Sequence, residues 1–194
     1  IDLVFPHHEN EIAQSTCSNG GDKFARYWLH NGFLNIEQEK MSKSTGNVLL
    51  VHNLLKDISG EVIRLALLNA HYRQPLDWTE TGVTQAKRQL DRLYGALRKL
   101  SSIETSIPPQ PDAQFLTALN DDINTPNALA RLFELARFAN SASRKNDQIQ
   151  IKGSLIKSAS FLGILQQTPE SWFEQSSSKD SFLNNQQIDE LVKA

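Results

Sequence analysis

The most restrictive feature of the sequence is a row of apolar residues in its second half. Ala86, Leu90, Leu93, Leu97 and Leu100 follow one another at alternating intervals of four and three residues. This spacing places their side chains on one face of an α-helix, and that face needs a hydrophobic partner surface. We therefore predict that the chain from residue 84 onward folds mainly as packed helices. We assign its leucine rows to the core of a bundle and not to chemistry.

Further segments with helical spacing follow a loop that contains three prolines. Thr125 is a residue type that caps helices, and Pro126 suits the first helical position. Apolar residues recur at helical intervals on either side of this boundary. The sequence predicts a loop over residues 101–112 and helices over residues 113–121, 126–139, 151–162 and 182–192.

The first half combines a predicted strand with two shorter helices. Residues 1–5 are mostly apolar and predict a buried strand. Apolar residues at helical spacing predict helices over residues 48–56 and 59–70. Residues 71–78 break this period and predict an extended link.

A short lysine-rich segment lies between these two predicted helices and the strand. Residues 39–47 contain two lysines, three hydroxyl residues and a glycine. Ammonium and hydroxyl groups bind anions, and Gly46 lets a backbone approach closely. The segment lacks the glycine spacing of a P-loop, so lysine would supply most of the binding. By composition alone, a solvated polar turn remains the simpler alternative.

A histidine and a glutamate at helical spacing form a second polar group. Pro6 can start a helix, and on that helix His7 and Glu11 share one face. Such a pair can hold a divalent metal ion or form a hydrogen-bonded surface pair. The zinc-protease pattern His-Glu-x-x-His is excluded, because Ile12 occupies the second histidine position.

Composition excludes several classes of protein. The single cysteine, Cys17, permits no internal disulfide, which fits a reducing cytosol, and we expect it to be a packed thiol without a ligand role. No apolar run approaches the roughly 20 residues that span a bilayer, so we expect no membrane association. The net charge of −2 shows no general attraction to nucleic acid. Residues 64–99 nevertheless hold seven basic residues against three acidic ones, a local excess that could face RNA phosphates or merely be a solvated helix face.

Three stretches resemble a known family. Lys40-Met41-Ser42-Lys43-Ser44 is identical to the KMSKS signature of class I aminoacyl-tRNA synthetases. Residues 6–15, Pro-His-His-Glu-Asn-Glu-Ile-Ala-Gln-Ser, closely resemble the cysteinyl-tRNA synthetase family, and residues 115–139 resemble its helical tRNA-binding domain. The resemblance implies an α/β remnant of a Rossmann-type class I catalytic domain, followed by a mainly α-helical bundle domain. It implies boundaries at residues 1–36 for the catalytic part, 37–83 for the lysine loop with the stem-contact fold, and 84–194 for the bundle.

The resemblance also implies roles for individual residues. In this family the second lysine of the signature, here Lys43, steadies pyrophosphate with help from Lys40, so both are expected to be catalytic. Asp2 would contact the ammonium group of the amino acid. His7 and Glu11 would be two of four zinc ligands, with two cysteines expected upstream of residue 1. The implied ATP-binding residues are Lys40, Met41, Ser42, Lys43, Ser44, His30 and Gly32, although a histidine in an aromatic-rich stretch can equally be a packed residue.

The implied reaction joins cysteine to tRNA(Cys) through cysteinyl-adenylate, with ATP and Mg²⁺ as substrate. We expect a cytoplasmic monomer and, since no initiator methionine is present, an internal piece of a longer polypeptide that is inactive alone. Two alternatives remain open. One is the related cysteine ligase of mycothiol synthesis, and the other is a non-catalytic tRNA-binding module derived from a synthetase.

Overall fold

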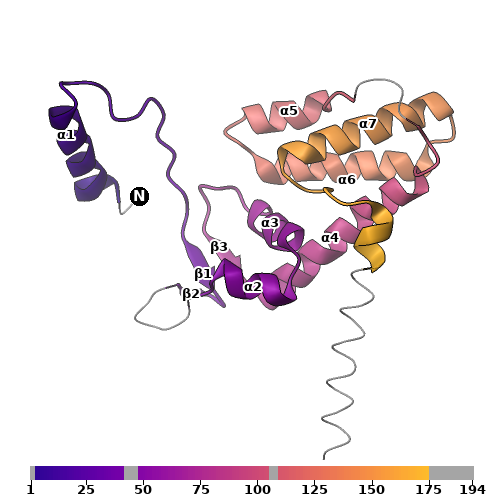
Figure 1. The fold of residues 1–194 in the computed structure, drawn as a ribbon, viewed down its shortest axis with the longest axis horizontal. Helices are drawn as coiled ribbons and strands as arrows, with labels where there is room; N and C mark the ends of the chain where they lie inside the picture. The colour runs from indigo at the N-terminus through magenta and orange to yellow at the C-terminus, as the bar shows by residue number, and fades with distance from the viewer. Residues whose placement is uncertain (1–2, 42–47, 105–108, 175–194) are drawn as a thin grey trace, which may run out of the picture.

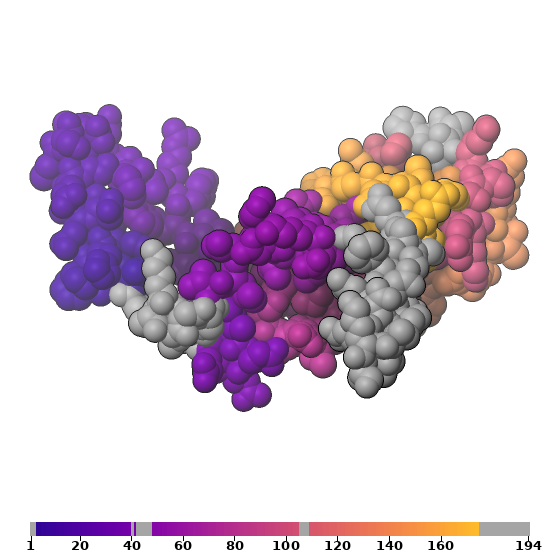
Figure 2. Space-filling view, turned by 60° about the horizontal axis from the view of Figure 1, so that its bottom comes forward, coloured from indigo at the N-terminus to yellow at the C-terminus, as the bar shows by residue number. Residues whose placement is uncertain are grey.

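The computed structural model of this chain describes residues 3–41, 48–104 and 109–174. Figure 1 shows an N-terminal helix at one end, a small sheet with two short helices in the middle, and a helical bundle at the other end. The space-filling view of Figure 2 keeps this order, with the N-terminal residues and the bundle on opposite sides of the sheet region. Among the described residues, no helix combines the length and apolar character needed to cross a membrane.

The N-terminal region is helical and largely exposed. A π-helical turn, η1 (Val4–His8), leads into α1 (Glu9–Ser18). The predicted buried strand over residues 1–5 is wrong for the described part, because residues 3–5 are exposed and only Phe5 has extended backbone angles. A strand is stable only beside another strand, and residues 3–5 pair with none of those described. Cys17 is also exposed, so the prediction of a packed thiol is wrong.

A three-stranded sheet occupies the middle of the molecule. β1 (Leu34–Ile36) pairs with β2 (Glu39–Lys40) as a tight antiparallel hairpin, and with β3 (Leu76–Trp78) in parallel. The two turn residues, Glu37 and Gln38, have positive φ angles, as two-residue hairpins require. The backbone amide of Gln38 donates to a carboxylate oxygen of Asp77 at 2.9 Å, which ties the turn to β3.

Two helices make the crossover between the parallel strands. They are α2 (Val51–Asp57) and α3 (Gly60–Leu68), close to the predicted positions. A parallel pair of strands needs a long connection of this kind. Within this connection, α3 packs one of its faces against α4 (Glu80–Lys99). The last three residues of the predicted extended link form β3. The sequence did not predict a strand there, because three residues are too few to show a strand pattern.

The predicted apolar row on α4 forms the centre of the core. Its members Ala86, Leu90 and Leu93 are fully buried, and Leu97 and Leu100 are nearly so. α5 (Ala113–Asn120), α6 (Thr125–Ser141) and α7 (Lys145–Phe161) pack with α4 around this row, which confirms the predicted bundle. The helix predicted over residues 182–192 lies outside the described residues.

Capping residues define where these helices begin. The Thr79 hydroxyl accepts from the amide of Gly82 at the start of α4, and Asp112 does the same for Phe115 in α5. For α6 the cap is Asn124, whose side-chain oxygen accepts from the amide of Asn127. The predicted cap, Thr125, is instead the first helical residue. Two adjacent residues of capping type made the choice ambiguous in the sequence.

Candidate functional site

The lysine-rich segment leaves the sheet at its edge. The backbone of Lys40 lies in β2 opposite Asn35, and the amide of Met41 donates to the carbonyl of Leu34 at 3.3 Å. The chain returns at Val48, just before α2. The start of the segment is therefore fixed to the central strand of the sheet. The other predicted residues of the segment, Ser42, Lys43 and Ser44, lie outside the described residues, as does Asp2.

His30 lies in a group of aromatic rings. Its ring centroid is 5.0 Å from that of His8, which in turn is 5.6 Å from the ring of Trp28. His30 is half-buried, and Nδ1 of His8 is buried without a hydrogen-bond partner in the described part of the chain. The structure thus gives His30 a packing role. Its contact with ATP stays a prediction.

Gly32 is held tightly against the link between α3 and β3. Its amide donates to the carbonyl of Tyr72 at 2.7 Å. A Cβ atom at this position would overlap the backbone of Gln74 and lie only 2.8 Å from the nitrogen of Pro75. No side chain fits without movement of that backbone, so the position requires glycine.

The predicted metal ligands lie at the start of the first helical region. His7 is the penultimate residue of η1 and Glu11 lies in the first turn of α1, and both are exposed. His8 is turned into the aromatic group, which leaves His7 as the histidine open to solvent. A nitrogen and a carboxylate ligand suit zinc, but a structural or catalytic site needs at least three protein ligands. Among the described residues, no group of three or more potential ligands comes together. The role of His7 and Glu11 as zinc ligands therefore stays a prediction.

A hydrogen-bonded cluster connects this region to the bundle. The hydroxyl of Tyr72 donates to Oδ1 of Asp122 at 2.7 Å, and Nε of Arg73 donates to its Oδ2 at 2.6 Å. Asp122 lies in the turn before α6. These bonds, first those from Arg73 and then that from Tyr72, lower the pKa of the Asp122 carboxyl to about 2. Tyr72 therefore contacts Gly32 through its carbonyl and the bundle through its hydroxyl.

A second, buried cluster closes the end of the bundle. The hydroxyl of Tyr94 on α4 lies 2.9 Å from both carboxylate oxygens of Glu61 on α3. The same carboxylate accepts from the backbone amides of Leu165 and Gln166, which follow α7. Burial, together with this carboxylate, raises the pKa of Tyr94. A buried carboxylate is tolerated here because the Tyr94 hydroxyl and two backbone amides donate hydrogen bonds to it.

Most of the seven basic residues between positions 64 and 99 contact other groups within the protein. Lys87 pairs with Asp91 one turn away, and the guanidinium groups of Arg92 and Arg98 lie over aromatic rings. Arg88 and Lys99 are exposed, and neither has a partner in the part of the chain that the structure describes. The charge available to an external anion is therefore smaller than the sequence count suggests.

Each half of the chain matches the model of a known protein family. Residues 1–88 match the catalytic domain of class I (C) tRNA synthetases, and residues 114–166 match the DALR domain. Along its whole length the chain is 55% identical to a protein named cysteine–tRNA ligase from Parvibaculum lavamentivorans. The chain belongs to the cysteinyl-tRNA synthetase family.

Other relatives with the same printed name agree. The protein from Maricaulis maris is 56% identical over 89% of this chain, and that from Xanthomonas campestris is 51% identical over 89%. The chain spans 42% of the Parvibaculum protein and 37% of each of the other two. The predicted fold class is confirmed as a class I catalytic-domain remnant with a small sheet, followed by a DALR helical domain. The predicted domain boundaries stay a prediction.

Sequence reasoning missed the residues that join distant parts of this chain. Tyr72 and Asp122 are 50 residues apart, and Tyr94 and Glu61 are 33 apart. No local spacing marks such pairs. The only signal was indirect, since a glutamate within the apolar face of a predicted helix needs a buried partner.

Proposed function

We propose that this chain works as part of a cysteine–tRNA ligase that activates cysteine with ATP and transfers it to tRNA(Cys). The observation that carries the proposal is the identity of residues 40–44 with the class I signature, in a chain whose close relatives bear that enzyme name. The anchored start of the segment supports it. Because Lys40 and Met41 lie at the edge of the sheet, the residues that follow leave from a fixed point.

The proposed task of the lysines is electrostatic. Negative charge grows on the leaving pyrophosphate as the adenylate forms, and cations already in place stabilise that charge most effectively. Lys43 would act there with help from Lys40, and Met41, Ser42 and Ser44 would complete the contact with ATP and its Mg²⁺. His30 and Gly32 would lie at the nucleotide, and Asp2 would hold the ammonium group of cysteine.

The proposed zinc site explains how cysteine is separated from serine. His7 and Glu11 would supply two ligands, and two cysteines outside this chain would supply the others. Zinc binds a thiolate much better than an alcohol, so a bound ion distinguishes the sulfur of the substrate directly. The solvent-open position of His7 and Glu11 supports this assignment. We also propose that the enzyme is a cytoplasmic monomer.

The test is product analysis with the complete protein, ATP, radiolabelled cysteine and tRNA. Cysteine attached to tRNA is the expected product. Cysteinyl-adenylate that forms but is passed only to an amino-sugar inositol would favour the mycothiol-type ligase. Binding of tRNA without adenylate, in protein with a full complement of zinc, would favour the non-catalytic module.

A further inference from the structure

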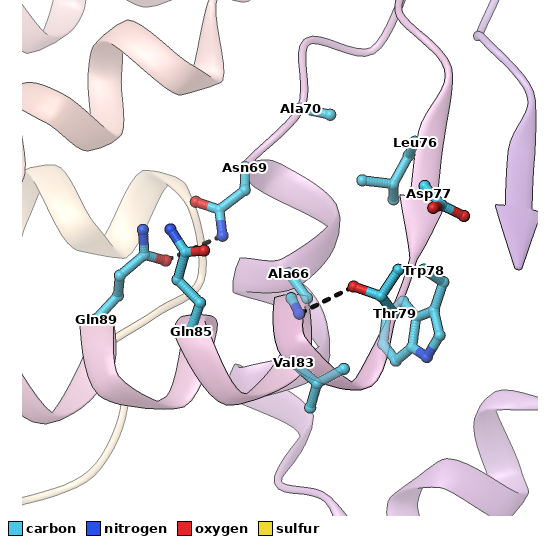
Figure 3. Close-up of a pocket in the computed structure, with 11 residues that line it drawn as sticks. Ala66, Asn69, Ala70, Leu76, Asp77, Trp78, Thr79, Val83, Gln85 and Gln89 are labelled. Carbon is cyan, nitrogen blue, oxygen red and sulfur yellow. Dashed lines mark hydrogen bonds between the residues drawn. The ribbon is translucent and has the colours of Figure 1, made fainter. Parts of the chain in front are cut away.

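A pocket of about 400 Å³ lies between α3, β3 and the first turns of α4. Its described lining contains none of the residues predicted to bind ATP or zinc. Figure 3 shows its two sides: three carboxamide side chains gather on one, and residues of β3 lie on the other. The carboxamides belong to Asn69, Gln85 and Gln89.

The carboxamide side can donate and accept hydrogen bonds. Asn69 Nδ2 donates to Oε1 of Gln89 at 2.9 Å, which leaves further donor and acceptor positions on both groups. Gln85 is exposed and has no partner among the described residues. These groups therefore present a neutral hydrogen-bonding edge to whatever enters the pocket.

The rest of the described lining combines apolar side chains with the hydroxyl of Thr79 and a single carboxylate. Ala66 and Val83 lie between the two sides, and the half-buried indole of Trp78 forms part of the far wall. Among the described lining residues the only carboxylate is Asp77, and one of its oxygens already accepts from the backbone of Gln38. The lining is therefore unsuited to a metal ion or a charged ligand. It suits a flat, neutral group with a polar edge.

Positive charge follows the pocket along α4. Arg88 follows Gln85 by three residues and Arg92 follows Gln89 by three, so all four side chains share one face of the helix. Both arginines are exposed, and Arg92 keeps its charge while it lies over the ring of Phe133. A neutral hydrogen-bonding pocket beside two cations matches a nucleotide, with its base in the pocket and its phosphates on the arginines.

We propose that this pocket binds one unpaired nucleobase of the tRNA. Asn and Gln side chains pair with base edges, and an aromatic wall provides a surface for stacking. The volume accommodates a base with its ribose. The inference rests on the proposed function, because that function supplies the RNA.

The experiment measures the affinity of the complete protein for a fluorescently labelled tRNA(Cys) transcript by anisotropy, at several salt concentrations. Gln85→Ala is the main variant, since its exposed side chain has no hydrogen-bond partner to lose among the described residues. We expect its Kd to rise about fivefold or more, because one base contact contributes roughly 1–3 kcal/mol. Its salt dependence should equal that of the wild type. Arg88→Ala should instead lower the slope of log K against log salt by about 1.

The matched control is Gln114→Ala, an exposed glutamine on α5 at the far side of the bundle. It should bind tRNA like the wild type. Equal affinities for Gln85→Ala and the wild type would overturn the inference, and so would a reduced salt slope in Gln85→Ala. If RNA binds with the expected pattern but is never charged, the proposed function fails and the pocket assignment stands. If charging is normal and Gln85→Ala has no effect on affinity, only the pocket assignment fails.

Discussion

At the scale of single residues, Gly32 shows how a position in a candidate nucleotide site is fixed by packing. Gly32→Ala would place a methyl group on the backbone of residues 74 and 75. Such overpacking costs typically 1–3 kcal/mol, so we expect the free energy of unfolding to fall by about 2 kcal/mol in urea denaturation.

Gly95→Ala is the control for this prediction. Gly95 lies inside α4, and outside the adjacent helix backbone no described atom lies within 4 Å of an added Cβ. Alanine there should raise the free energy of unfolding by about 0.5–1 kcal/mol, because glycine is a poor helix former. A Gly32→Ala protein as stable as the wild type would contradict the required close approach.

A second prediction concerns the proposed catalytic role of Lys43. Lys43→Ala in the complete enzyme should slow adenylate formation about a hundredfold or more, a size typical of a lost transition-state contact. The dissociation constant for cysteine should stay within about twofold. Single-turnover adenylate formation and equilibrium binding of cysteine measure the two quantities. Comparable losses in both would show that Lys43 has no special role in the transition state.

At the scale of elements, the turn before α6 is joined to the link before β3 through Asp122. Its folded-state pKa of about 2 lies below the usual value of about 3.9. The stabilisation is therefore complete above about pH 4 and is lost as the pH falls toward 2. Asp122→Asn should be less stable than the wild type at pH 6, and this difference should shrink on acidification.

Denaturation of both proteins between pH 6 and pH 2 measures that difference. Asp121→Asn is a suitable control, since the neighbouring Asp121 is exposed and its side chain has no partner among the described residues. Its difference from the wild type should be small at every pH. A difference for Asp122→Asn that persists unchanged at pH 2 would show that the carboxylate charge is not what stabilises the contact.

The elements also show what the sequence could predict. α4 was predictable because its apolar row repeats over several turns and every member is buried. β3 was not, because it has three residues and its partner lies about 40 positions earlier. Short parallel pairing depends on tertiary contacts that no local pattern records.

At the scale of the whole molecule, chemistry and architecture were predictable to different degrees. Residues 6–15 and 40–44 identified the family because a reaction requires particular side chains at particular spacing. The contacts that join the sheet region to the bundle gave no such signal. Glu61, for example, meets Leu165 across 104 residues of sequence. The site residues that lie outside the described part, Asp2 and Lys43 among them, remain predictions from the resemblance.

We have proposed that this chain belongs to an enzyme that charges tRNA with cysteine and rejects serine. The most direct measurement compares charging of tRNA(Cys) by the complete, zinc-loaded protein with cysteine and with serine, together with the variant Glu11→Gln. We expect cysteine to be charged at least about 10⁴-fold more efficiently than serine, a selectivity that binding can reach when a site recognises one polar atom. Glu11→Gln should lose zinc and selectivity together. No charging with either amino acid, or equal charging with both, would contradict the account.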